Sequence, residues 1–171
     1  STMPMGHAVD GTPLQIHYAM SVIANKGLLM KPRIIDRITN AEDVLLFEYP
    51  VVTKRRVLIE SVSQQMADLL NEVVANGTAK RAIIKGYSVG GKTGTTQKII
   101  NGQYTSESHV ASFSGFLPLE DPELVITVVV DAPKVKGGSG YGGVVAAPVF
   151  KEIAEECIRY LGIRSSEYSK E

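Results

Sequence analysis

Apolar residues recur at helical spacing near the start of the chain, between two signals that mark helix ends. Thr12-Pro13-Leu14-Gln15 has the pattern of a capping box with proline in the first turn, and Gly27 suits a left-handed helix end. The segment LQIHYAMSVIAN between these signals is therefore predicted to be a helix. Its predicted buried face comprises Leu14, Ile16, Ala19, Met20, Ile23 and Ala24.

A second helix is predicted in QQMADLLNEVVANG, after two short strands in KPRIIDRITN and LLFEYP. Ser61-Val62-Ser63-Gln64 has the pattern of another capping box, and Gly77 marks the end of the helix. The helical spacing predicts one buried face formed by Met66, Leu69, Leu70, Val73 and Val74.

From Tyr87 onward the pattern becomes that of strands. Asn101-Gly102 is a strong signal for a two-residue hairpin, HVASFSGFLP alternates, and LVITVVVD has the continuous apolar run of a buried strand. Gly-rich GGSGYGG follows, and Pro148 is predicted to open a last helix, VFKEIAEECIRYL. The inward residues of that helix are predicted to be Val149, Phe150, Ile153, Cys157, Ile158 and Leu161.

This order of elements predicts an α+β fold, in which helices pack on an antiparallel sheet. The 171 residues suit one domain, predicted to span residues 1–163 and to end in a frayed polar tail at 164–171. The 18 basic and 18 acidic residues balance, so no basic field favours a nucleic-acid partner. Tryptophan is absent and aromatic residues make up 6%, which also argues against a base-stacking surface.

The candidate metal ligands are few and scattered. A single cysteine, Cys157, excludes an internal disulfide and a multi-cysteine metal site, and its inward position predicts a core residue. His7, His17 and His109 show no metal-ligand spacing. We interpret His17 as structural, whereas His109 follows the predicted hairpin and is placed near the rim of any cleft there.

The chain contains no apolar stretch of about 20 residues that would suit a membrane span. Its opening, STMPMGHAVDG, has neither the basic start nor the apolar run of a signal peptide and reads as the middle of a protein. We therefore expect a piece of a longer protein, in which an anchor could lie upstream.

The stretch GYSVGGKTGTT, residues 86–96, fits two kinds of site. Gly86, Gly91, Lys92 and Thr93 satisfy the phosphate-loop pattern, and the later Asp131 could be its magnesium-binding acid. A phosphate loop needs a helix directly after the lysine, yet poor helix formers and the hairpin signal follow here. The same letters contain Lys92-Thr93-Gly94, the K-T-G triplet of penicillin-binding proteins and β-lactamases.

Four blocks in order favour the second interpretation. GTPLQIHYAMSVIANKGLLMKPRI, NGTAKRAIIKGYSVGGKTGTTQK, HVASFSGFLPLEDPELVITVVVDAP and GGVVAAPVFKEIAEECIRYL together resemble the C-terminal part of the transpeptidase domain of class B (monofunctional) penicillin-binding proteins. The resemblance covers about residues 6–161 and implies the penicillin-binding/serine β-lactamase-like fold. It also implies a D,D-transpeptidase that cross-links peptidoglycan through an acyl-serine and needs no metal or cofactor.

The resemblance assigns roles along the K-T-G strand. Lys92 and Thr95 would be catalytic, and Thr93, Gly94 and Thr95 would bind the substrate. Lys92 would supply positive charge near the serines, the Thr95 hydroxyl would bind the substrate carboxylate, and the Thr95 N–H would line the oxyanion hole. Gly94 would allow the substrate backbone to lie against the strand, whereas Gly90 and Gly91 are expected to serve close packing.

Two elements of the full signature do not occur. No serine is followed by Lys at the third position, and the chain has no Ser-x-Asn. We therefore expect a fragment that is inactive alone, because the nucleophile and the second motif lie upstream in this family. The expected partners are stem peptides ending in D-Ala-D-Ala, β-lactams and the cell-wall synthesis machinery. The expected location is outside the cytoplasm on a membrane-anchored parent, with a dimer of the fragment as a further expectation.

Two alternatives of the same fold stay open at this point. One is a β-lactam sensor that binds without turnover, and the other is a serine β-lactamase. The β-lactamase is disfavoured, because such enzymes do not usually combine the T-P-L-Q helix with the AAPVF closing helix.

Overall fold

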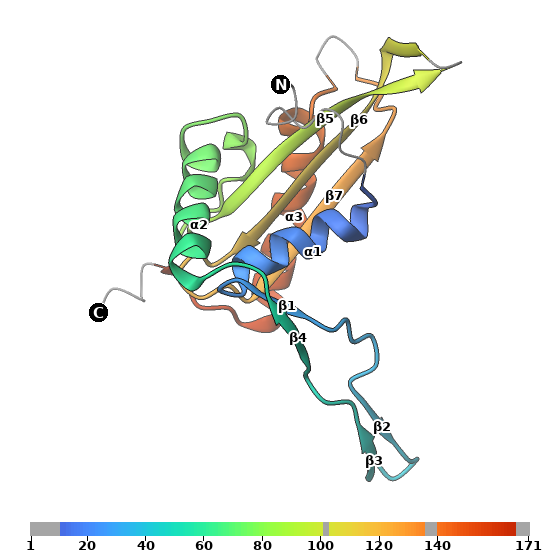
Figure 1. Cartoon of the computed structure of the whole chain (residues 1–171), viewed down its shortest axis with the longest axis vertical. Coiled ribbons are helices and arrows are strands. Elements are labelled where there is room, and N and C mark those ends of the chain that lie inside the picture. Colours follow the sequence, from blue (N-terminus) through green and yellow to red (C-terminus); the bar gives the residue numbers. More distant parts are fainter. Residues whose placement is uncertain (1–10, 101–102, 136–139, 167–171) are drawn as a thin grey trace.

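The computed structural model describes residues 11–100, 103–135 and 140–166 (Figure 1). Its elements confirm the predicted α+β class, because helices pack on an antiparallel sheet. In chain order they are α1 (Pro13–Ala24), β1 (Leu28–Met30), β2 (Arg37–Thr39), β3 (Leu45–Glu48), β4 (Thr53–Arg56), α2 (Glu60–Ala75), the short 3-10 helix η2 (Lys80–Ala82), β5 (Gly90–Ile100), β6 (Gln103–Leu117), β7 (Leu124–Asp131) and α3 (Gly142–Leu161).

The main sheet has the order β5–β6–β7, and both strand pairs are antiparallel. β6 is the central strand, so Lys92 of β5 and Thr127 of β7 both lie opposite Ser114. The predicted turn at Asn101-Gly102 lies outside the described residues, but β5 and β6 pair up to Ile100 and Gln103 on either side of it. An extended strand therefore follows Lys92, and the phosphate-loop alternative is wrong because it requires a helix there.

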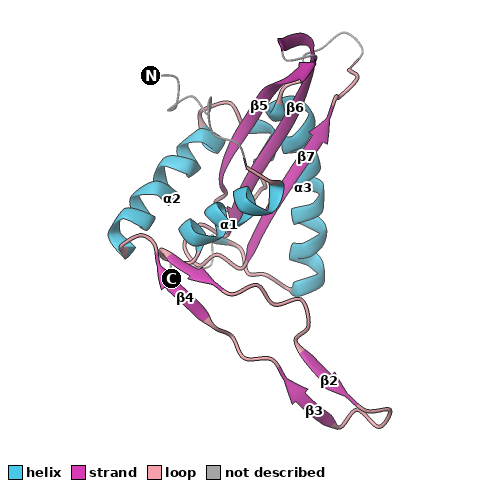
Figure 2. Cartoon of the chain, turned by 45° about the vertical axis from the view of Figure 1, so that its right-hand side comes forward, coloured by secondary structure: helices cyan, strands magenta, loops and turns pink. Residues whose placement is uncertain are grey.

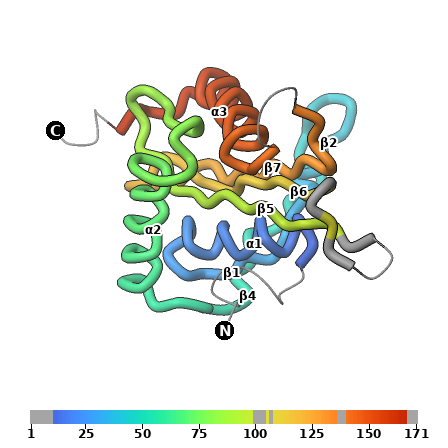
Figure 3. Tube along the Cα trace, turned by 90° about the horizontal axis from the view of Figure 1, so that it is seen from above, coloured from blue at the N-terminus to red at the C-terminus, as the bar shows by residue number. Residues whose placement is uncertain are grey.

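Two hydrophobic clusters hold the helices to the two faces of this sheet. On one face, Phe113 of β6 packs edge-to-face on Phe150 of α3, with ring centroids 4.7 Å apart. On the other face, Phe116 of β6 packs with Met20 of α1 and Leu70 of α2. Figure 3 shows α3 and α1 on opposite sides of the sheet, with α2 beside the β5 edge. The phenylalanines of β6 thus connect both layers.

The first helix forms as its capping signals predict, but its buried face differs from the prediction. The Thr12 hydroxyl accepts a hydrogen bond from the Gln15 N–H, and the Gln15 side chain accepts one from the Thr12 N–H. Only the second half of the helix is covered, by α2, β6 and β7, so its buried residues are Met20, Val22 and Ala24. The prediction was wrong for Leu14, Ile16 and Ala19, which are exposed.

The second helix begins one residue before the predicted capping box. It starts at Glu60, and no side chain caps its first turn. Ser63 is buried and its hydroxyl donates to the Ile23 carbonyl of α1 at 2.7 Å. The prediction was wrong for Met66 and Leu69, which are exposed. The buried face of the helix consists instead of Ser63, Ala67, Leu70 and Val74.

These contacts predict opposite effects for two nearby serines. Ser63→Val should lower the free energy of unfolding by about 1–3 kcal/mol, because it removes the donor and leaves the Ile23 carbonyl unsatisfied. Ser61→Ala should change it by less than about 0.5 kcal/mol, because Ser61 is exposed and caps nothing. Urea unfolding of both variants checks this. A loss of about 1 kcal/mol in the free energy of unfolding for Ser61→Ala would show that Ser61 caps the helix after all.

The last helix begins at Gly142, so the predicted start at Pro148 was wrong: this proline lies inside the helix. Proline has no N–H to donate to the residue four positions earlier. That residue is Val144, and its carbonyl accepts a hydrogen bond from Arg81 Nη1 at 3.4 Å instead. A side chain from η2 therefore replaces the missing helical donor.

The buried face of α3 also contains fewer of the large apolar residues than predicted. Of the predicted inward residues, Phe150 and Ile158 are buried and Cys157 is half-buried. Val149, Ile153 and Leu161 are exposed, contrary to the prediction. Small residues take their place, so that the helix lies close to the sheet on Ala146, Ala147 and Ala154.

The strand predicted to be fully buried is a half-buried edge strand among the described residues. Within β7 only Val128 is buried, and Val129 is 38% exposed. Asp131, the candidate magnesium ligand of the rejected alternative, pairs with Lys98 Nζ at 2.6 Å.

The chain stays packed for three residues beyond Ile163. Ser166 is buried, its N–H donates to the Gly86 carbonyl at 2.9 Å, and its hydroxyl accepts from the Ser88 N–H at 3.0 Å. The same hydroxyl donates to Glu120 Oε2 at 3.0 Å. These bonds join the segment before the K-T-G strand to Ser166, beyond the end of α3.

Residues 28–56 form a long extension from the body, which we call the arm (Figure 2). Two antiparallel ladders make it up, β1 with β4 next to the body and β2 with β3 at the far end. The two strands predicted around a turn in this region are confirmed as β2 and β3. None of the described helices is both long and apolar enough to cross a bilayer.

Candidate active site

The K-T-G residues lie on β5, which pairs only with β6 among the described strands. Because side chains alternate along a strand, Thr93 and Thr95 share one face and Lys92 and Gly94 the other. The two threonines line an open hollow of about 520 Å³. Among the described residues the lining consists of Gly77, Thr78, Lys80, Arg81, Thr93, Thr95, Tyr141, Gly143 and Val144.

Hydrogen bonds join three segments around this hollow. Thr93 Oγ1 lies 3.0 Å from Thr78 Oγ1, in the connection between α2 and η2. Thr95 Oγ1 accepts a hydrogen bond from the Gly142 N–H, the first residue of α3, at 3.2 Å. The threonine hydroxyls therefore contact the connection between α2 and η2 and the first residue of α3.

Glycines at the start of α3 allow this close approach. A Cβ on Gly142 would lie 2.3 Å from the Ser112 carbonyl oxygen and 2.6 Å from that of Gly94. A Cβ on Gly143 would lie 2.2 Å from the Thr78 carbonyl oxygen. These contacts are with backbone, so no change of rotamer could relieve them.

The glycines of the strand itself serve packing, as predicted for two of them. A Cβ on Gly90 would lie 2.7 Å from Phe116 Cζ, and one on Gly91 would lie 2.4 Å from Phe113 Cζ. A Cβ on Gly94 would lie 2.5 Å from Ser112 Oγ, which can rotate away. A glycine at position 94 therefore leaves room for the Ser112 side chain of the neighbouring strand. That it also lets a substrate lie against the strand stays a prediction.

The charges around the hollow are positive. Lys80 and Arg81 line it, and no aspartate or glutamate among the described residues does. Exposed Lys92 is not part of the lining, and its Nζ donates to the Thr93 carbonyl at 3.0 Å. The structure thus unites Thr93 and Thr95 with two cations that the sequence analysis did not single out. The surroundings favour an anionic ligand.

Thr78 and Val144 were not predicted as lining residues, and Tyr141 was assigned no binding role although its segment was expected near the cleft from the family resemblance. The only signal for Thr78 was its place in the NGTAKRA block, and Tyr141 follows a Gly-rich stretch with no periodic pattern. A hollow that combines three segments distant in sequence cannot be identified from local spacing.

The histidines take separate positions. His17 Nδ1 lies 3.2 Å from Thr127 Oγ1, which fits its predicted structural role. His109 Nε2 lies 2.7 Å from the Gly140 carbonyl oxygen, next to Tyr141 of the lining. His7 lies outside the described residues. Within the part of the chain that the structure describes, no group of three or more His, Cys, Asp or Glu side chains could hold a metal.

No described serine or cysteine lines the hollow, so its hydroxyls are those of threonines and Tyr141. Ser114, directly across from Lys92, is buried and bonds Thr127 Oγ1 at 2.7 Å. The arrangement can bind and orient an anion, but its described residues offer no serine nucleophile at the same place.

The sheet, its K-T-G edge strand and the helices on both faces give the fold of penicillin-binding protein transpeptidase domains. The model of the penicillin-binding protein transpeptidase domain matches residues 1–155. The chain belongs to this family, as the class B resemblance predicted.

Named relatives agree with this assignment. Stage V sporulation protein D of Bacillus subtilis (strain 168) is 39% identical over 168 residues, covering 96% of this chain and 25% of that protein. A probable peptidoglycan D,D-transpeptidase PenA of Neisseria flavescens is 33% identical over 166 residues, covering 95% and 38%. The chain thus spans well under half the length of both relatives.

Solved structures give the same result. The transpeptidase domain of penicillin-binding protein 3 from Burkholderia pseudomallei is 32% identical with a TM-score of 0.80, covering 96% of this chain and 47% of that one. Penicillin-binding protein 3 from Mycobacterium tuberculosis, solved in complex with ampicillin, is 28% identical with a TM-score of 0.81 and coverages of 96% and 38%.

Proposed function

We propose that this chain forms the K-T-G wall of a peptidoglycan D,D-transpeptidase, whose nucleophilic serine is supplied by protein outside these 171 residues. The main support is the hollow that Thr93 and Thr95 line together with two cations and, in the part of the chain that the structure describes, no acidic side chain. A substrate that ends in D-Ala-D-Ala carries a carboxylate, and a β-lactam mimics it. Both suit a positively charged hollow with fixed hydroxyl groups.

The proposed reaction has two steps. The serine oxygen attacks the carbonyl carbon between the two D-Ala residues, and the C–N bond breaks. The terminal D-Ala leaves as an amine that carries the proton lost by the serine. An amine of a neighbouring stem peptide then attacks the ester, forms the cross-linking amide, and returns a proton to the serine oxygen. A β-lactam would stop at the first step, because its leaving group stays attached.

In this proposal the threonines bind and orient the substrate, and Lys92 assists the transfer of the serine proton. The Thr95 hydroxyl binds the carboxylate, and its backbone N–H helps to stabilise the oxyanion of each tetrahedral intermediate. The Thr93 hydroxyl, fixed by Thr78, orients the same carboxylate. The Lys92 ammonium is held by the strand's own backbone, where it favours the loss of the serine proton. Gly94 leaves the strand free to pair with an extended substrate.

The cellular setting follows from the substrate. Peptidoglycan is assembled outside the cytoplasm, so we place the whole protein there, anchored by a membrane segment that is not among these residues. Its partners would be stem peptides and the cell-wall synthesis machinery. The relatives named above are transpeptidases and a sporulation protein, which supports this setting.

The 171-residue chain alone should form no acyl-enzyme with penicillin. No serine of the sequence has the Ser-x-x-Lys arrangement that supplies its base, and none of the serines that the structure describes lines the hollow. Intact-mass spectrometry after incubation with benzylpenicillin tests this, with a complete penicillin-binding protein as positive control. A penicilloyl adduct on any serine of this chain would contradict the proposal that the nucleophile lies elsewhere.

A further inference from the structure

The arm exposes far more apolar surface than its length requires. Ten of its large hydrophobic residues are at least 38% exposed, and Ile34 is fully exposed. They are Ile34, Ile35, Ile38, Val44, Leu45, Leu46, Phe47, Tyr49, Val51 and Val52. Single exposed apolar residues are normal, but a continuous group of this kind marks an interaction surface.

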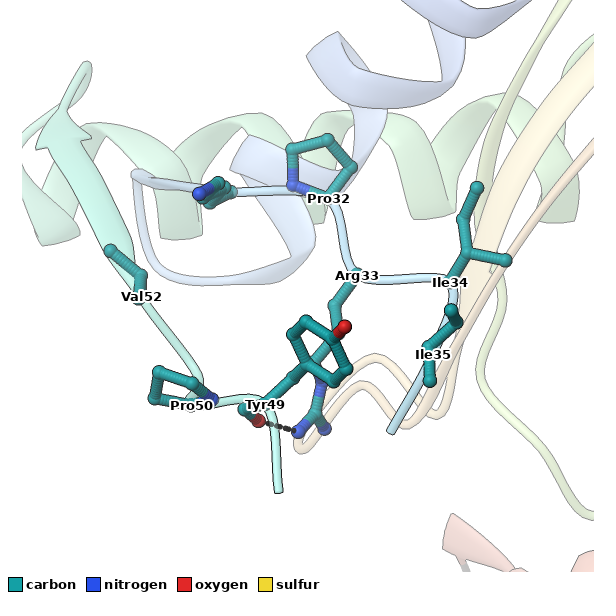
Figure 4. A pocket seen from close by; sticks show the side chains of 8 residues that line it. Pro32, Arg33, Ile34, Ile35, Tyr49, Pro50 and Val52 are labelled. Carbon is teal, nitrogen blue, oxygen red and sulfur yellow. Dashed lines mark hydrogen bonds between the residues drawn. The ribbon is translucent and has the colours of Figure 1, made fainter. Parts of the chain in front are cut away.

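Part of this group forms an ordered stripe. Ile38 and Phe47 lie opposite each other in the β2–β3 ladder, and the Phe47 and Tyr49 rings meet edge-to-face at 4.8 Å. Tyr49 also lines a hollow of about 340 Å³ with Ile34, Ile35 and Val52, where the two strands of the arm separate (Figure 4). The stripe thus runs from an exposed aromatic ring at one end to an apolar hollow at the other.

The hollow is built between the two ladders and is not a loose gap. Arg33 Nη1 donates to the Tyr49 carbonyl at 2.6 Å and pairs with Asp36 at 2.8 Å. The Lys31 N–H donates to the Val52 carbonyl at 2.8 Å on the other side. Both ends of the separated strands are therefore closed by hydrogen bonds, and Figure 4 marks the one between Arg33 and the Tyr49 carbonyl.

Charges are segregated along the arm. The arm base, residues 28–32 and 53–56, carries Lys31, Lys54, Arg55 and Arg56 and no acidic residue. The arm tip, residues 37–48, carries Glu42, Asp43 and Glu48 against one cation, Arg37. The base is positive and the tip negative, and all these charged side chains are exposed.

We propose that two copies of this chain associate through their arms, which lie antiparallel with the tip of one on the base of the other. This two-fold arrangement places opposite charges together twice, and it brings Phe47 of each copy to the hollow of the other. A parallel arrangement would place like charges together. An acidic peptide or an anionic membrane would match the base but be repelled by the tip. The inference does not depend on the proposed catalytic function, because the arm contributes no residue to the 520 Å³ hollow.

Charge exchange provides the test, with association of the 171-residue chain measured by sedimentation velocity. One variant reverses the base (Lys31→Glu, Lys54→Glu, Arg55→Glu); Arg56 is kept because it bonds the Lys26 and Leu58 carbonyls. A second variant reverses the tip (Glu42→Lys, Glu48→Lys), leaving Asp43, which has a positive φ of 59°. A matched control reverses three exposed cations elsewhere (Lys85→Glu, Lys134→Glu, Arg164→Glu).

The wild-type chain is expected to dimerise, more weakly as salt is raised. Each reversed variant should raise the dissociation constant about tenfold or more, whereas an equal mixture of the two should associate, because each base then meets a complementary tip. Phe47→Ser should weaken the dimer, and Tyr160→Ser, at an 89% exposed site on α3, should not.

Three results would overturn the inference. The first is a wild-type chain that stays monomeric up to high micromolar concentration. The second is self-association that both reversed variants retain as strongly as the control. The third is a monomer that instead binds vesicles containing phosphatidylglycerol through its basic residues, which would assign the arm to a membrane surface.

Discussion

Replacing Lys92 with alanine should lower the second-order rate constant for acylation of the whole transpeptidase by penicillin about a hundredfold or more. The ammonium is the positive charge of the K-T-G triplet. The exposed Lys92 side chain lies on the face of β5 opposite Thr93 and Thr95, and its Nζ donates to the Thr93 carbonyl. Its removal takes away the charge that favours the serine alkoxide in the transition state. Stopped-flow measurement of acylation, on a protein that contains this segment and the Ser-x-x-Lys motif, gives the rate directly.

Two companion variants make this measurement specific. Lys85→Ala removes another exposed lysine outside the site and should leave the rate unchanged. Lys92→Arg keeps the charge but changes its shape and should fall between wild type and Lys92→Ala. Acylation of Lys92→Ala within about threefold of wild type would remove Lys92 from the mechanism.

The largest loss of stability is expected for Phe150→Ala, about 3–5 kcal/mol. Phe150 is fully buried and packs on Phe113 between α3 and the sheet. Truncation removes its apolar contacts and leaves a cavity in the cluster that holds α3 next to Thr95. Urea unfolding followed by circular dichroism measures the effect on this chain.

The neighbouring residue supplies the control. Val149 is 38% exposed, so Val149→Ala should cost less than about 1 kcal/mol. The helical spacing of the sequence predicted that both residues are buried, whereas in the structure Phe150 is buried and Val149 is exposed. Equal losses for the two variants would show that α3 packs as the sequence pattern predicted and not as described here.

The sequence predicted the elements well, because helix caps, glycine ends and strand alternation are local signals. The capping box at Thr12 and the pairing of β5 with β6 are two examples. It failed where burial depends on what covers an element. Leu14 and Ile16 keep helical spacing, yet no described segment covers them. Pro148 gave the usual signal of a helix start, and Arg81 of η2 made an earlier start possible.

All the site residues that the sequence predicted lie on one strand, β5. Thr93 and Thr95 were found from the K-T-G triplet, and the structure places both on one hollow. Lys80, Arg81 and Tyr141 were not found, because they approach the strand only through the packing of η2 and α3. Lys92 was expected to supply positive charge near the serines, which stays a prediction, and alternation along the strand puts its side chain on the face opposite Thr93 and Thr95.

We propose above that Thr93 and Thr95 bind the substrate carboxylate in an active site whose serine lies outside this chain. A crystal structure of the whole transpeptidase after reaction with penicillin would show both groups at once. We expect an ester on the serine of a Ser-x-x-Lys motif outside these 171 residues, with the penicillin carboxylate within hydrogen-bond distance of Thr93 Oγ1 and Thr95 Oγ1. An ester on a serine of this chain, or a carboxylate bound away from both threonines, would contradict it.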